Sequence, residues 1–163
     1  MENAFADWSD FNVAVAGAGA ALAGLLIVAM SVNIAETLNA ATLPARAGAS
    51  VGTVMLAVAA SCLALVPGQP VWLLGAEVLA GAGVVWLLEA HAARPILREP
   101  GQRGAVRAMK VLVGALPPAV FTAGAALLAA GADSAYAWVA AGSVLAFLGA
   151  VLFSWIALVE NHR

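Results

Sequence analysis

The chain has 163 residues, of which 64% are hydrophobic and only 10% are charged. A soluble domain of this size needs about a quarter of its residues charged to cover its surface. The composition therefore excludes a soluble globular protein and indicates a polytopic membrane protein. The net charge of -2 gives no reason to expect nucleic acid as a partner, and the single cysteine, Cys62, excludes a disulfide framework within the chain.

Five segments are long and apolar enough to cross the hydrocarbon core of a bilayer, which takes about 20 helical residues. In chain order they are residues 11–35, 45–66, 71–93, 105–130 and 135–159. Proline and glycine at residues 67–70 and 131–134 predict tight turns between neighbouring segments. The predicted fold class is therefore all-α: a bundle of five transmembrane helices that forms a single domain over residues 1–163.

The basic residues predict the orientation of the bundle. With five membrane spans, all seven fall on one side of the bilayer: Arg46, Arg94, Arg98, Arg103, Arg107, Lys110 and Arg163. The positive-inside rule then places the N-terminus outside the cell and the C-terminus in the cytoplasm. The basic stretch Arg94–Lys110 is expected to be a cytoplasmic loop that contacts anionic lipid headgroups.

Glu77 lies six residues into the third segment and is the costliest residue to place in lipid. A carboxyl group at this depth is by default a functional residue that faces the bundle interior. The expected partners are neutral side chains: Ser61, Thr122 and Ser143, with Asn12 and Tyr136 as further candidates. One hypothesis is a protonatable group that lines a cavity or a protomer interface. The alternative is a neutral acid that forms a hydrogen bond between helices and serves only packing.

A second polar group is expected at the cytoplasmic ends of the helices. Glu36, Glu89 and Glu160 lie at the cytoplasmic ends of the first, third and fifth segments, where the negative end of the helix dipole disfavours a carboxylate by up to about 1 kcal/mol. Compensating cations are therefore expected in an acidic–basic belt. The remaining members of this belt are Asn33, Arg46, His91, Arg94 and His162.

A divalent-metal site is a less favoured interpretation of the same residues. Its candidate ligands are Glu89, His91, Glu160 and His162, since imidazole and carboxylate suit divalent cations. Residues two apart point to opposite sides of a helix, which disfavours such a site. A haem held by His91 and His162 is weaker still, so no cofactor is predicted.

Small residues recur at helical spacing and mark packing faces. The first segment contributes Gly17, Ala21 and Gly24, the third Gly83, and the fifth Gly142 and Gly149. Such rows let helix backbones approach closely, either within one chain or between copies in a homo-oligomer. Both possibilities stay open at this point.

Pro117 and Pro118 interrupt the fourth segment near its middle. Proline removes a helix hydrogen bond and clashes with the preceding turn. We expect either a fixed kink, or a hinge with exposed carbonyl groups that line a cavity.

Two stretches carry a resemblance to known proteins: Phe11-Asn12-Val13-Ala14-Val15-Ala16-Gly17-Ala18 with Ser31-Val32-Asn33-Ile34, and Trp155 before Leu158-Val159-Glu160. They resemble a scattered group of small bacterial multi-pass membrane proteins, some of which are labelled modulators of the membrane protease FtsH. The modulator label belongs to a larger seven-span family. The resemblance implies a bacterial inner membrane and little about mechanism.

The sequence contains no phosphate-binding loop, nucleophile–base pair or redox motif, so an enzyme is not expected. The leading hypothesis is a homo-oligomeric channel or transporter that uses Glu77. The alternative is a non-transporting accessory or regulatory subunit of a larger membrane protein. A third possibility is a lipid- or cofactor-binding membrane protein.

Overall fold

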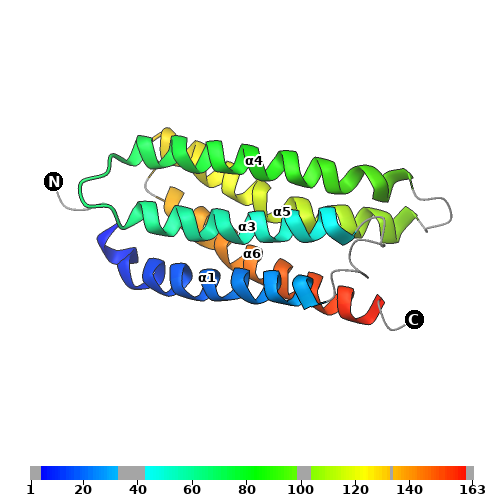
Figure 1. Cartoon of the computed structure of the whole chain (residues 1–163). Helices are drawn as coiled ribbons and strands as arrows, with labels where there is room; N and C mark the ends of the chain where they lie inside the picture. The colour runs from blue at the N-terminus through cyan, green and yellow to red at the C-terminus, as the bar shows by residue number, and fades with distance from the viewer. Residues whose placement is uncertain (1–4, 33–42, 99–103, 133, 161–163) are drawn as a thin grey trace.

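The chain folds into a bundle of long, antiparallel α-helices (Figure 1). A computed structural model describes residues 5–32, 43–98, 104–132 and 134–160. These residues form a short 3-10 helix and five α-helices: η1 (Ala6–Trp8), α1 (Ser9–Val32), α3 (Leu43–Ala64), α4 (Val71–Arg98), α5 (Gly104–Ala129) and α6 (Ala135–Glu160). Each α-helix is long and apolar enough to cross a membrane, and no strand occurs in the described residues. The predicted all-α class is confirmed, with five helices that are long and apolar enough to span a membrane.

The stretch from Arg94 to Lys110 differs from the predicted loop. Helix α4 continues to Arg98 and α5 begins at Gly104, so most of this stretch is helical. Pro95 lies inside α4, where its missing N–H removes one hydrogen bond from the last turns of the helix. Basic residues report the edge of the membrane, and helices extend beyond that edge, so the loop prediction was too long.

The turns follow the predicted chemistry. Gly131 has φ 74°, and the N–H groups of Gly131 and Ala132 donate to the carbonyl groups of Leu128 and Leu127. This is a Schellman motif, which ends α5 with a glycine in the left-handed region. Gly68 has φ 73° between α3 and α4, so both hairpins turn on a glycine that other residues replace only with strain.

Four of the helices form a ring and the fifth lies outside it. Helices α3, α4, α5 and α6 each pack against two neighbours in this ring, and α1 packs mainly against α3 (Figure 1). Half of the most apolar stretch of α3 is buried, against 22% for α1. The start of α1 and the end of α6 lie at opposite ends of the bundle (Figure 1). The remaining apolar surface is available to lipid.

Glycine residues set the closest contacts between the helices of the ring. A Cβ atom at Gly75 would lie 2.8 Å from the backbone nitrogen of Ala129, and one at Gly124 would lie 2.9 Å from that of Val139. A Cβ atom at the predicted packing residue Gly142 would lie 3.1 Å from the ring of Phe121. Backbones approach this closely only where no side chain intervenes, so these glycines hold α4, α5 and α6 together.

The other predicted packing residues are placed differently. A Cβ atom at Gly149 would lie 4.0 Å from Pro117, which is ordinary contact. A Cβ atom at Gly17, Gly24 or Gly83 would meet nothing within 4 Å, and Ala21 is exposed on the same helix as the first two. These positions on α1 and α4 therefore make no close helix contact within the described chain.

We predict that Gly75→Ala destabilises the protein. The new methyl group meets the backbone of α5, which cannot rotate away, so α4 and α5 must separate at a cost of about 1–3 kcal/mol. The measurement is the thermal unfolding midpoint of the purified protein in detergent. Gly83→Ala is the matched control, because the same methyl group meets open space there. Equal midpoints for the two variants would contradict the close α4–α5 contact.

Candidate functional site

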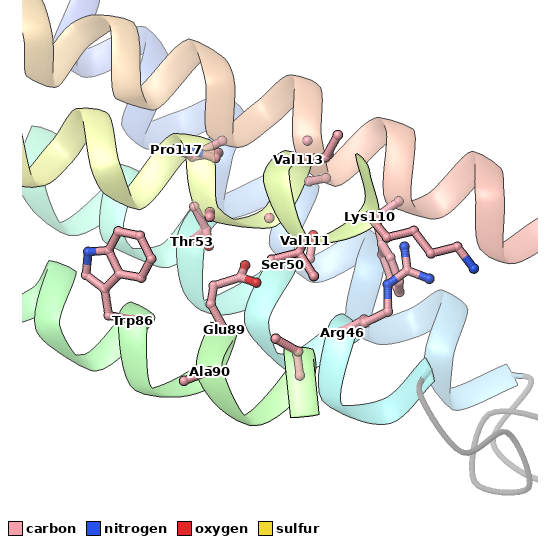
Figure 2. A pocket seen from close by; sticks show the side chains of 18 of the residues that line it. Arg46, Ser50, Thr53, Trp86, Glu89, Ala90, Lys110, Val111, Val113 and Pro117 are labelled. Carbon is pink, nitrogen blue, oxygen red and sulfur yellow. The ribbon is translucent and has the colours of Figure 1, made fainter. Parts of the chain in front are cut away.

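A cavity of about 230 Å³ lies inside the ring, between α3, α4, α5 and α6. It occupies the half of the bundle in which α3 and α5 begin and α4 and α6 end (Figures 1 and 2). Most of its wall is apolar and is built from Trp86, Val113, Pro117, Ala146, Ala150 and Phe153, among others. A concave, mostly apolar site with a few polar groups is the usual form of a small-molecule site.

The polar groups of the cavity come from three helices. Helix α3 contributes Arg46, Ser50 and Thr53, which share one face because they are four and three residues apart. Helix α4 contributes Glu89, and α5 contributes Lys110. Figure 2 shows Arg46 and Lys110 toward one end of the cavity, Trp86 toward the other and Glu89 between them. The cavity thus holds charges of both signs.

The Glu89 carboxyl group rests in a space that Gly114 leaves free. A Cβ atom at Gly114 would lie 2.5 Å from Glu89 Oε2 and 3.1 Å from its carboxyl carbon. Any larger residue at this position of α5 must displace the carboxyl group. Gly114 therefore positions Glu89 in the cavity.

Arg46 and Glu89 influence each other without direct contact. The charge of Arg46 acts on the Glu89 carboxyl group, yet no ion pair joins them within the described part of the chain. The guanidinium carbon of Arg46 lies 5.4 Å from the ring centroid of Phe153, a distance at which a cation is attracted to an aromatic face. The two opposite charges thus face the cavity from different walls.

The hydroxyl groups around the cavity differ in their bonding. Thr53 donates to the carbonyl of Ala49 at 2.8 Å. Thr122 donates to the carbonyl of Pro118 at 2.7 Å and accepts from Trp86 Nε1 at 3.1 Å, which fixes the indole ring. The Ser50 hydroxyl oxygen is buried and has no hydrogen-bond partner among the protein groups described. Buried polar groups are normally paired, so Ser50 is available to a ligand.

Helix α5 continues through Pro117 and Pro118. Because proline lacks an N–H, the carbonyl groups of Val113 and Gly114 have no donor one turn later in the helix. Both of these residues line the cavity. The two prolines therefore leave backbone acceptors beside Glu89.

Glu77 lies outside this cavity. It is partly buried and accepts a hydrogen bond from Gln69 Nε2, in the turn that joins α3 to α4. Of the neutral side chains expected beside it, Asn12, Thr122 and Ser143 bond to other groups. The Ser143 hydroxyl donates to the carbonyl of Val139 at 3.0 Å, Ser61 is buried on α3, and Thr122 bonds to Trp86.

Asn12 lies in an aromatic cluster at the Glu77 end of the bundle. Its side chain is fully buried, and its Oδ1 accepts a hydrogen bond of 2.6 Å from the Tyr136 hydroxyl. The Tyr136 ring packs against Phe5 at 5.0 Å and Trp8 at 5.3 Å between centroids. This cluster ties α1 to α6. Of the predicted intramembrane polar residues, Asn12 therefore bonds to Tyr136 and Glu77 to Gln69.

Of the predicted cytoplasmic belt, the structure brings together Arg46 and Glu89. His91 and Arg94 lie exposed on α4. Asn33, Glu36 and His162 lie outside the described residues, as does the side chain of Glu160, the last residue of α6. Among the residues that the structure describes, no group of three His, Cys, Asp or Glu side chains could hold a metal ion.

Several cavity residues were not singled out from the sequence. Ser50 follows Arg46 by one helical turn, a spacing that places the two on one face of α3. Gly114 precedes Pro118 by four residues, a spacing that marks a carbonyl without a helix donor. These signals gain meaning only when the neighbour on the facing helix is known.

Comparison of the chain with protein-family models, with curated proteins and with solved structures finds no match in any of the three. The function is therefore inferred from the geometry of the cavity.

We predict that Tyr136→Phe destabilises the fold. It leaves the buried Asn12 side chain without its donor, which costs about 1–3 kcal/mol. Unfolding in detergent, followed by tryptophan fluorescence, measures the change in free energy. The double variant Asn12→Leu/Tyr136→Phe removes both polar groups and should recover part of the loss. A Tyr136→Phe variant as stable as the unmodified protein would show that this hydrogen bond contributes nothing.

Proposed function

We propose that this small integral membrane protein binds and transports a small solute through the cavity around Glu89, in a bacterial inner membrane. The observation that carries the proposal is a carboxyl group within a membrane-spanning helix that faces a mostly apolar cavity. Ionisable groups inside membrane spans are rare and usually mark substrate or ion pathways. Arg46, Lys110 and the unpartnered Ser50 hydroxyl give the same cavity further groups for recognition.

Glu89 takes the role that the sequence suggested for Glu77. Glu77 already accepts a hydrogen bond from Gln69 and lies off the cavity wall. Glu89 lies in the space left by Gly114 and faces cations from α3 and α5. The difference between the two carboxyl groups makes Glu77 a matched control for Glu89.

The orientation follows from charge. The basic residues of the described chain lie at the cavity end of the bundle: Arg46, Arg94, Arg98, Arg107 and Lys110. By the positive-inside rule this end faces the cytoplasm and contacts anionic headgroups, so the N-terminus lies outside. Release to the other side requires the helices to move. The proline pair in α5 provides a place where the helix lacks two hydrogen bonds.

We predict that Glu89→Gln abolishes transport and that Glu77→Gln does not. The purified full chain is reconstituted into liposomes, and uptake of labelled leucine, leucinamide and N-acetylleucine is measured. These probes share one apolar body and differ in charge. Wild-type protein should take up at least one of them faster than empty liposomes. Glu89→Gln should lower that uptake about tenfold or more, since hydrogen bonds to charged groups contribute about 1.5–3 kcal/mol.

Two results would contradict the transport proposal. One is that none of the three probes enters faster than in empty liposomes. The other is that Glu77→Gln stops uptake while Glu89→Gln leaves it unchanged, which would return the role to Glu77. Both variants keep the size of the side chain, and their thermal unfolding midpoints control for folding.

A second candidate function is an accessory subunit that associates with a membrane partner, and the outer face of α1 favours it. Gly17, Ala21 and Gly24 are exposed there, and the two glycines have nothing within 4 Å of an added Cβ atom. Small-residue faces suit close helix contacts, including those of a homo-oligomer.

We predict a homo-oligomer that Gly17→Leu/Gly24→Leu converts to a monomer, because leucine keeps the two backbones apart. Mass measurement of the protein in detergent tests this. A wild-type monomer that copurifies with one larger membrane protein supports the accessory role. A wild-type monomer with no such partner contradicts both forms of association.

A further inference from the structure

We infer that the ligand of the cavity is a small zwitterion, with a primary ammonium group, an anionic group and a compact apolar body. This inference depends on the transport proposal and specifies its substrate class. Three features of the cavity carry it: opposite charges on facing helices, unpaired polar groups beside them, and an apolar remainder of limited volume.

The charges exclude ligands of a single sign. A cation that pairs with Glu89 is repelled by Arg46, which lines the same cavity. An anion that pairs with Arg46 is repelled by Glu89, whose carboxyl group already experiences the charge of Arg46. A zwitterion can form a charge-assisted hydrogen bond at each pole. It also brings no net charge into the membrane.

The arrangement of the polar groups sets the orientation of the ligand in the cavity. Arg46 and Ser50 lie one turn apart on α3, so a carboxylate or phosphate oxygen can accept from both. The ammonium group then lies at Glu89, next to Gly114. The carbonyl groups of Val113 and Gly114, which lack helix donors, are further acceptors for its N–H groups.

The rest of the cavity fits a short apolar body. Trp86, held by Thr122, lies toward the end away from Arg46 and Lys110, with Pro117 on the facing wall (Figure 2). An engineered protein cavity of about 150 Å³ holds benzene, so 230 Å³ holds roughly nine non-hydrogen atoms. That is the size of leucine.

A ligand with these two charged groups can come from two sources. One is a free apolar amino acid from the cytoplasm. The other is the ethanolamine phosphate headgroup of a phospholipid in the inner leaflet, since Arg46 and Lys110 lie at the end of the bundle assigned to the cytoplasmic surface. Both carry an ammonium group with three N–H donors and an anionic oxygen group, so the experiment must separate them.

The test measures binding of leucine, leucinamide and N-acetylleucine to the purified full chain by titration calorimetry. Leucine should bind roughly ten- to a hundredfold tighter than either of the other two, because only leucine satisfies both poles. Glu89→Gln should remove its advantage over N-acetylleucine, and Arg46→Gln its advantage over leucinamide. Ser50→Ala should weaken leucine binding about two- to tenfold, and Glu77→Gln should leave all three affinities unchanged.

The second arm tests the lipid source. The protein is placed in nanodiscs of phosphatidylethanolamine mixed with phosphatidylcholine, whose quaternary headgroup has no N–H donor, and retained lipid is identified by native mass spectrometry. Selective retention of phosphatidylethanolamine that Glu89→Gln and Arg46→Gln abolish, without leucine binding, supports the zwitterion and assigns it to the lipid.

The assignment is wrong if leucinamide or N-acetylleucine binds as tightly as leucine, or if neither leucine nor phosphatidylethanolamine is bound. In those cases the transport proposal still stands if the uptake of any probe depends on Glu89. Conversely, zwitterion binding without any uptake contradicts transport and leaves the ligand class standing. The binding and uptake measurements therefore fail separately.

Discussion

Close contact between helix backbones is the interaction on which this structure depends. Lipid is as apolar as the side chains, so burial alone gives these helices little reason to associate. Gly75 and Gly124 allow α5 to approach α4 and α6 to within backbone contact, where van der Waals attraction accumulates. This close packing fixes the ring of α3 to α6. The cavity persists because two of its lining positions, Gly114 and Gly149, carry no side chain to fill it.

A second constraint is that polar groups in lipid must find partners within the protein. The hydroxyl groups of Thr53, Ser143 and Ser154 are paired within their own helices, since each donates to the carbonyl four residues earlier. Asn12 is paired with Tyr136 across helices. The Ser50 hydroxyl differs from these hydroxyl groups, because it is buried without a protein partner and lines the cavity that Glu89 also lines.

Much of the fold could be predicted because it depends on properties that are local in the chain. The length of an apolar run sets the number of spans, and Gly68 and Gly131 mark the turns. The loop from Arg94 to Lys110 was predicted too long, because charge reports membrane depth and not where helical hydrogen bonding stops. Among the carboxyl groups, the sequence favoured Glu77 for its depth in the membrane, and no local pattern shows that Gln69 satisfies it.

The sequence by itself determined five helices that are long and apolar enough to span a membrane, and the order of the basic residues between them, because composition, run length and charge order are properties of the linear chain. The tertiary structure decided which helix faces which. It alone brings Arg46 and Ser50 of α3 to the same cavity as Glu89 of α4, and sets Gly114 of α5 against that carboxyl group. Such neighbours depend on how each helix is rotated about its axis and on which helices are adjacent. Side-chain packing between helices sets both the rotation and the adjacency, and neither can be read from the sequence of one segment.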